Sequence, residues 1–250
     1  MIISKEHKYI FIGIPFSGST AISSELCLLY GGEPILNKHA NIQMLHGSGL
    51  DLSSYTVAAV LRNPVDTLRT YYYKLKSPPD GYYNEARFNV EQGGHIRKKD
   101  RKRYAAVQAG NLTFTQFINR YHRLPYDTFF SLNKPYLNCI IRFADLNNSF
   151  RAFLLQCGIE PQRDLPVINR SEAKRAAGIE DEPLPLCFQP FIYENRDLLG
   201  LDIPRPNFFY YQLYRSLKPL RFAHWTRRDR KQPIQKYGTY YQLLQRNSST

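Results

Sequence analysis

The residues best suited to chemistry form a Gly/Ser-rich stretch near the start of the sequence, Gly13-Ile-Pro-Phe-Ser-Gly-Ser-Thr20. This spacing is that of a nucleotide P-loop, in which backbone N–H groups and a helix N-terminus form a cradle for an anion. The lysine of a Walker A motif should stand at position 19, which is Ser here. The stretch therefore predicts a phosphate site but disfavours a standard ATPase or kinase. A plain strand-to-helix turn capped by Ser17 is the alternative interpretation.

A second polar group follows the apolar run at residues 55–61. Arg62 comes directly after that run, and Thr70 falls about two turns into the helix expected next. Since ligands of open α/β sheets bind at the carboxyl ends of strands, we expect Arg62 at the same edge as the Gly18 turn. A guanidinium there suits a phosphate, and the Thr70 hydroxyl adds a donor. In the alternative interpretation, Arg62 pairs with a carboxylate such as Asp66.

The hydrophobic pattern predicts the strands and helices that position these groups. Continuous apolar runs predict buried strands at 8–15, 55–61 and 138–143. Helical spacing predicts helices at 21–30, 65–76, 113–123, 146–157 and 191–199. Strands that alternate with helices indicate an α/β fold with a central parallel sheet flanked by helices. At 250 residues, the chain fits a single domain over 1–250.

Composition and charge narrow the possible partners. The chain has 34 Lys and Arg against 21 Asp and Glu, a formal charge of +13, which favours a polyanionic partner such as a nucleic acid, an acidic membrane surface, an acidic glycan or a nucleotide. No Cys/His cluster or acidic loop predicts a metal site. No apolar stretch is long enough for a membrane span and no signal-peptide pattern is present, so a cytoplasmic protein with four free thiols is expected.

The two polar groups together resemble motifs of the sulfotransferases that use 3′-phosphoadenosine 5′-phosphosulfate. The 5′-phosphosulfate motif of that superfamily, PKxGST or PRSGTT, corresponds to Pro15-Phe-Ser-Gly-Ser-Thr20. Its 3′-phosphate motif, RNPxxRxxSxY, corresponds to residues 62–72, with Thr70 in the place of the serine. The step Lys38-His-Ala40 is similar to the KHA or KHS step of carbohydrate-type members. Weaker similarities at 142–159, 165–171 and 193–198 extend the resemblance over residues 8–200.

The resemblance implies a P-loop NTPase-like sulfotransferase fold and a role for each matched residue. Six residues would hold the nucleotide donor: Ser17, Gly18, Ser19 and Thr20 its 5′-phosphosulfate, and Arg62 and Thr70 its 3′-phosphate. His39 would be the base that deprotonates the acceptor, since the ordinary pKa of histidine lies near neutrality. Weaker candidates for the base are His46, His95 and His122.

One departure from the family concerns Phe16, where other members have Lys or Arg. That cation neutralises charge on the leaving phosphate, and a phenyl ring cannot do so. Either Lys38 or the basic run 97–103 supplies the cation, or catalysis is slow, or the chain binds the nucleotide without transferring sulfate.

We therefore expect a sulfotransferase that moves the sulfuryl group of 3′-phosphoadenosine 5′-phosphosulfate to a hydroxyl of a carbohydrate or another small acceptor, without a metal. The basic loop 77–104 and the aromatic, basic tail 205–250 are expected on the acceptor side. A catalytically impaired nucleotide-binding relative is the first alternative. A P-loop kinase would need a Mg²⁺ ligand, for which Asp145 is a poor candidate. A nucleic-acid-binding module, explained by charge alone, is the last alternative and is not expected.

Overall fold

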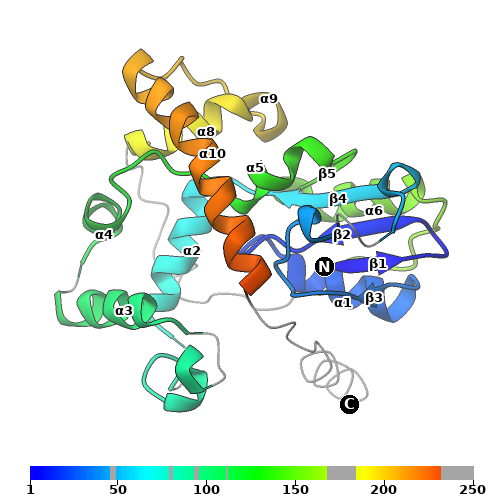
Figure 1. Cartoon of the computed structure of the whole chain (residues 1–250), viewed down its shortest axis with the longest axis horizontal. Helices are drawn as coiled ribbons and strands as arrows, with labels where there is room; N and C mark the ends of the chain where they lie inside the picture. Colours follow the sequence, from blue (N-terminus) through cyan, green and yellow to red (C-terminus); the bar gives the residue numbers. More distant parts are fainter. Residues whose placement is uncertain (46–48, 79–80, 93–95, 111, 168–183, 232–250) are drawn as a thin grey trace.

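A computed structural model describes the whole chain except residues 46–48, 79–80, 93–95, 111, 168–183 and 232–250 (Figure 1). The described residues build a mixed five-stranded sheet in the order β3-β1-β2-β4-β5, with helices around it. Its strands are β1 (Ile2–Ser4), β2 (Tyr9–Ile12), β3 (Glu33–Pro34), β4 (Thr56–Leu61) and β5 (Cys139–Arg142). The predicted α/β class is therefore confirmed.

The three strands predicted from the sequence form the parallel part of the sheet. β4 lies between β2 and β5 and pairs with both in parallel, with Phe11 opposite Ala58 and Ala59 opposite Ile140. Long connections separate these strands, as parallel pairs require, and they contain α1 (Ser19–Leu29) and α2 (Pro64–Lys76). The carboxyl ends of the three strands therefore meet at one edge of the sheet.

The prediction of a parallel sheet is wrong for β1 and β3, which run antiparallel to their neighbours. The turn between β1 and β2 is so short that Ser4 pairs with Tyr9, and such a turn can only reverse the chain. β3 adds Glu33 and Pro34 at the outer edge, where a proline is tolerated. Strands of three and two residues are too short to give the hydrophobic pattern from which strands are predicted.

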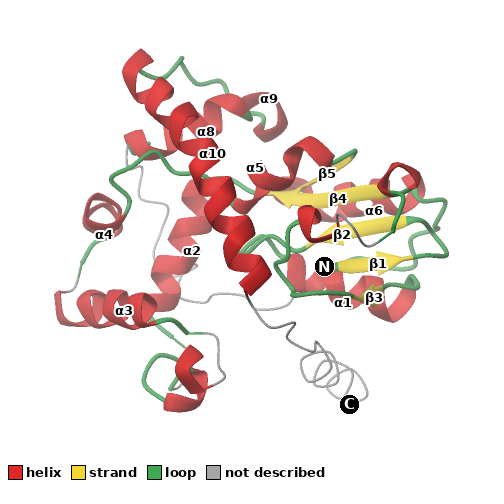
Figure 2. Cartoon of the chain, in the orientation of Figure 1, coloured by secondary structure: helices red, strands yellow, loops and turns green. Residues whose placement is uncertain are grey.

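Alternate residues of β2 pack into different cores, which explains why this strand is apolar throughout. Tyr9 and Phe11 share one core cluster with Phe153 of α6 (Leu146–Gln156) and with residues of α1. Ile10 and Ile12 belong to a second, larger cluster with residues of α2 and of helices later in the chain. The sheet therefore has helices on both faces (Figure 2).

The remaining described helices complete this arrangement. They are α3 (Lys98–Gly110), α4 (Phe114–Tyr121), α5 (Phe129–Asn133), α8 (Gln189–Glu194), α9 (Arg196–Leu199) and α10 (Phe208–Lys231). Short 3₁₀ turns include η1 (Ile42–Leu45) and those at 52–54, 86–88, 90–92, 134–136, 143–145 and 186–188. The long helix α10 contacts both α8 and η1, so a late part of the chain returns to the segment that follows His39 (Figure 1).

Several predicted boundaries are confirmed and two are wrong. The helices expected at 21–30, 65–76, 113–123 and 146–157 correspond to α1, α2, α4 and α6. The basic run 97–103 enters α3 at Lys98 and does not lie in a loop, because Lys, Arg, Ala and Gln favour helix. The helix expected at 191–199 is two short helices that meet at Asn195. The tail forms α10 up to Lys231, and its remainder lies outside the described residues.

Two expectations about the whole chain can also be compared with the fold. Among the described helices, none is both long and apolar enough to cross a membrane. All four cysteines lie in described segments and are free thiols, as the sequence predicts.

Candidate anion-binding site at the carboxyl edge of the parallel strands

The loop between β2 and α1 is held together by its own serines. The hydroxyls of Ser17 and Ser19 donate to the carbonyl oxygen of Ile14 at 2.8 and 3.0 Å. Both serines are buried, and both hydroxyls are already engaged within the loop. Ser17 is not the helix cap: Gly18 is the N-cap of α1, and no described side chain caps this helix. A helix start of this kind attracts an anion.

The backbone of this loop is held in an unusual conformation. Gly18 has a φ of +74°, and an added Cβ would lie 3.3 Å from atoms of both Phe143 and Leu146. Phe16 has a φ of +60°, which costs a non-glycine residue about 1–3 kcal/mol. Strain of this size persists only where the surroundings hold it. At Phe16 the holding contact is a hydrogen bond that Arg62 donates to its carbonyl oxygen.

Arg62 connects the loop to α2. Its guanidinium donates from Nη1 to the Phe16 carbonyl and from Nη2 to Oγ1 of Thr70, the latter at 3.0 Å. The guanidinium carbon lies 4.0 Å from the ring centre of Phe143. Burial lowers the pKa of Arg62, and the smaller effect of Asp66 raises it. Arg62 forms no ion pair with any described residue, so the alternative of a structural pair with Asp66 is not what the side chain adopts.

Lys38 and His39 lie against the same loop. The ammonium of Lys38 donates to Oγ1 of Thr20 at 2.7 Å. Burial, and then the charge of Lys74, lower the pKa of Lys38 to about 8. Nδ1 of His39 is 2.7 Å from the carbonyl oxygen of Gly13. Because a carbonyl only accepts, Nδ1 carries the proton in this contact, and in the neutral form of the ring the lone pair is then on Nε2.

Lys74 is a functional candidate that the sequence reasoning missed. Its ammonium lies 5.2 Å from the ring centre of Phe16, and burial lowers its pKa. A usable signal was present in the sequence. Lys74 stands four residues after Thr70, so the two side chains share one face of α2.

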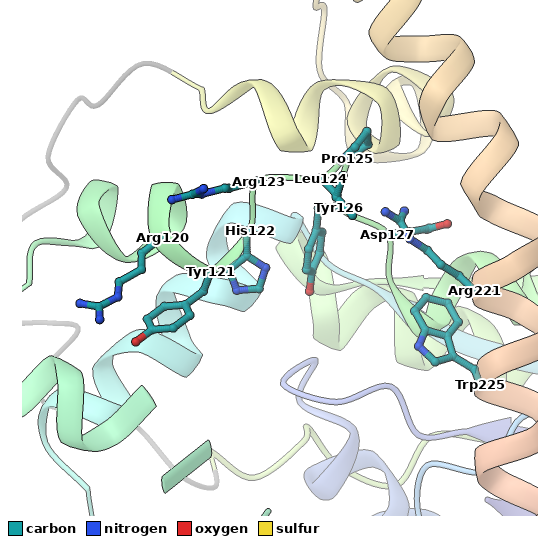
Figure 3. A pocket seen from close by; sticks show the side chains of 10 residues that line it. All are labelled: Arg120, Tyr121, His122, Arg123, Leu124, Pro125, Tyr126, Asp127, Arg221 and Trp225. Carbon is teal, nitrogen blue, oxygen red and sulfur yellow. The ribbon is translucent and has the colours of Figure 1, made fainter. Parts of the chain in front are cut away.

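The eight residues predicted to bind the donor or to act in catalysis thus converge on one edge of the sheet. Two of the weaker histidine candidates, His46 and His95, lie outside the described residues. The third, His122, lies in a neighbouring hollow of about 380 Å³ (Figure 3). The hollow is lined by Arg120, Tyr121, His122, Arg123, Leu124, Pro125, Tyr126, Asp127, Arg221 and Trp225.

The hollow is basic and aromatic, with buried polar atoms along its walls. One wall is the end of α4 and the segment after it, and the other is α10 (Figure 3). Nε2 of His122, Oδ2 of Asp127 and Nη1 of Arg221 are buried and have no hydrogen-bond partner among the described residues. Burial lowers the pKa of His122 to about 4, with a further effect of Arg103 and Lys99, so its imidazole is neutral at pH 7.

Two sets of contacts connect this hollow with the loop. On one side, Phe16 packs on Tyr71, Tyr71 on Phe117, and Phe117 on His122, with ring centres 5.7, 6.0 and 5.7 Å apart. On the other side, the hydroxyl of Thr226 in α10 bonds to the side-chain oxygen of Gln43 at 2.9 Å. Gln43 follows His39 closely in the sequence, so α10, which forms one wall of the hollow, contacts the segment after His39.

In the described part of the chain, no group of three or more His, Cys, Asp or Glu side chains is placed to hold a metal ion. Comparison of the chain with protein-family models, with curated proteins and with solved structures finds no match. The resemblance to sulfotransferases therefore depends on the residues themselves and on their arrangement.

Proposed function

We propose that this protein is a sulfotransferase that moves the sulfuryl group of 3′-phosphoadenosine 5′-phosphosulfate to a hydroxyl of a carbohydrate or another small acceptor. The observation that carries the proposal is the double contact of Arg62, which bonds to the Phe16 carbonyl and to the Thr70 hydroxyl at once. The segments that resemble the two donor-binding motifs therefore meet at one side chain, as they must if they hold two ends of one nucleotide.

The nucleotide would be held by positive charge and by hydrogen bonds from backbone N–H groups. The N–H groups of residues 17–20 and the start of α1 suit the 5′-phosphosulfate. The guanidinium of Arg62 suits the 3′-phosphate, which would replace the contacts it now makes with neutral oxygens. When bound, the donor supplies an activated sulfuryl group, and a metal ion is not part of the proposal.

His39 would remove the proton of the acceptor. Its contact with the Gly13 carbonyl fixes the tautomer and keeps Nε2 as the proton acceptor. The acceptor oxygen forms a bond to sulfur as the bond between sulfur and the bridging oxygen breaks, and the bond electrons go to the leaving phosphate. Cations at the loop stabilise that charge, and Lys38, fixed on Thr20, is one of them.

The hollow between α4 and α10 is the proposed acceptor site. Its arginines suit an acidic group, Asp127 could accept a hydroxyl, and Trp225 and Tyr121 offer faces to a sugar ring. Trp225 is the only tryptophan of the chain, so its fluorescence reports on this hollow. We expect a saturable change with a disaccharide that carries glucuronic acid, and affinity about tenfold weaker for neutral cellobiose or after Arg221→Ala, the size of one charge-assisted hydrogen bond. Equal affinity for both sugars would contradict this assignment.

Calorimetry with 3′,5′-adenosine bisphosphate, ATP-Mg and an oligonucleotide tests the proposed class. Tightest binding of the bisphosphate supports it, whereas preference for ATP-Mg favours a kinase and preference for the oligonucleotide a nucleic-acid module. A transfer assay with labelled donor over a panel of glycans and small alcohols follows. Binding without transfer would favour the second candidate, a catalytically impaired relative that only binds the nucleotide. This candidate is suggested by Phe16, which lacks the charge of the usual Lys or Arg.

A further inference from the structure

The ring of Phe16 lies where the related motifs have a cation, and a lysine from another element lies beside it. The ammonium of Lys74 lies 5.2 Å from the ring centre, within the range of a cation–π contact. The side chain of Lys74 forms no hydrogen bond or ion pair with any residue that the structure describes. A half-buried ammonium that makes a cation–π contact but no hydrogen bond with a described residue has N–H donors left for a ligand.

The position of Lys74 beside other cations points to an anion. Lys38 and Lys74 are close enough that the charge of Lys74 lowers the pKa of Lys38. Arg62 reaches the same loop through the Phe16 carbonyl. Neighbouring positive charges repel one another, and an anion bound between them would remove the repulsion. The backbone cradle of the loop supplies the remaining donors for such an anion.

We propose that Lys74 of α2 is the cation that binds the sulfuryl end of the donor, in the role that position 16 has lost. This inference depends on the proposed function and adds a residue to it. During transfer, the electrons of the breaking S–O bond pass to the bridging oxygen of the leaving phosphate, and the Lys74 ammonium stabilises that charge by donating to it. The proton of the acceptor hydroxyl goes to His39. The Phe16 ring positions the ammonium through the contact at its face.

The test uses Lys74→Met, which keeps most of the length of the unbranched side chain and removes its charge. We expect transfer to fall about 100-fold, as when one oxyanion contact is removed. A second readout does not need activity: binding of adenosine 5′-phosphosulfate should weaken at least tenfold, while binding of adenosine 3′-monophosphate stays within twofold. Lys76→Met is the matched control, because Lys76 is an exposed lysine near the end of the same helix. Thermal unfolding checks that both variants fold.

A double variant places the charge back at the loop. Phe16→Lys combined with Lys74→Met should recover most of the lost transfer and the lost phosphosulfate binding. If Lys74→Met behaves like Lys76→Met in both readouts, the role of Lys74 is refuted and the proposed function stands. If the wild-type chain binds neither adenosine 5′-phosphosulfate nor 3′,5′-adenosine bisphosphate, the proposed function and this inference fall together.

Discussion

Replacement of Arg62 with alanine tests whether the loop and α2 hold two ends of one nucleotide. The guanidinium bonds to the Phe16 carbonyl and to Thr70, and its Nε is buried with no partner among the described residues. A 3′-phosphate would accept from this group, and hydrogen bonds to charged groups contribute about 1.5–3 kcal/mol. Arg62→Ala should therefore weaken binding of 3′,5′-adenosine bisphosphate by about 10- to 150-fold.

The loss of affinity in Arg62→Ala has two causes that must be separated: the missing contact with the 3′-phosphate and a change in the loop. The Phe16 carbonyl also loses its donor, and a looser loop would weaken any ligand of the cradle. Adenosine 5′-phosphosulfate has no 3′-phosphate, so the decrease in its affinity reports only the effect of the changed loop. Calorimetry with both ligands should show a loss about tenfold larger for the bisphosphate. Arg151→Ala is the control, because it removes a half-exposed arginine of α6 that pairs with Asp164.

Two results would refute this reasoning. Equal losses for the two ligands would mean that Arg62 acts only on the loop and does not touch a 3′-phosphate. Unchanged affinities for both ligands would remove Arg62 from the site altogether, and the correspondence of residues 62–72 with the 3′-phosphate motif would then have no function in this chain.

Two further predictions concern the segment at 38–39. His39→Ala should lower transfer about 10²–10⁴-fold, the usual contribution of a general base, while calorimetry shows binding of the bisphosphate within twofold of wild type; unchanged transfer would exclude His39 as the base. Lys38, with a pKa of about 8, is charged below that pH and neutral above it. Affinity for adenosine 5′-phosphosulfate should therefore fall by up to about tenfold between pH 7 and pH 9, and Lys38→Arg, which stays charged, should flatten the profile. If affinity falls equally in the arginine variant, the pH dependence belongs to another group.

Much of the loop and its surroundings could be predicted because local patterns determine them. The apolar run before Gly13 predicts a strand, and the glycine and serines after it predict a turn into a helix. Arg62 follows a buried strand, so its place at the same edge follows from parallel topology. What the sequence could not provide is the direction of each hydroxyl. Ser17 and Ser19 donate to Ile14, a contact set by loop conformation and not by residue type.

The features that were missed have different causes, and only the hollow depends on contacts between distant segments. The hollow brings residues 120–127 together with Arg221 and Trp225, about a hundred positions later, and no local pattern encodes that meeting. The helix α3 was missed because its basic residues have no apolar stripe, with Val107 as its one buried residue. Lys74 could have been found, since its spacing from Thr70 follows from helix geometry alone.

The series of rings that begins at Phe16 determines when the side chain at position 16 becomes ordered. The rings of Phe16, Tyr71, Phe117 and His122 are in contact before any ligand arrives. A lysine at position 16 would keep its rotamer freedom until an anion fixed it, and that loss of entropy would count against binding. A phenyl ring packed among others has already lost this freedom during folding. The loop is thereby preorganised, and ligand binding need not order the side chain at position 16.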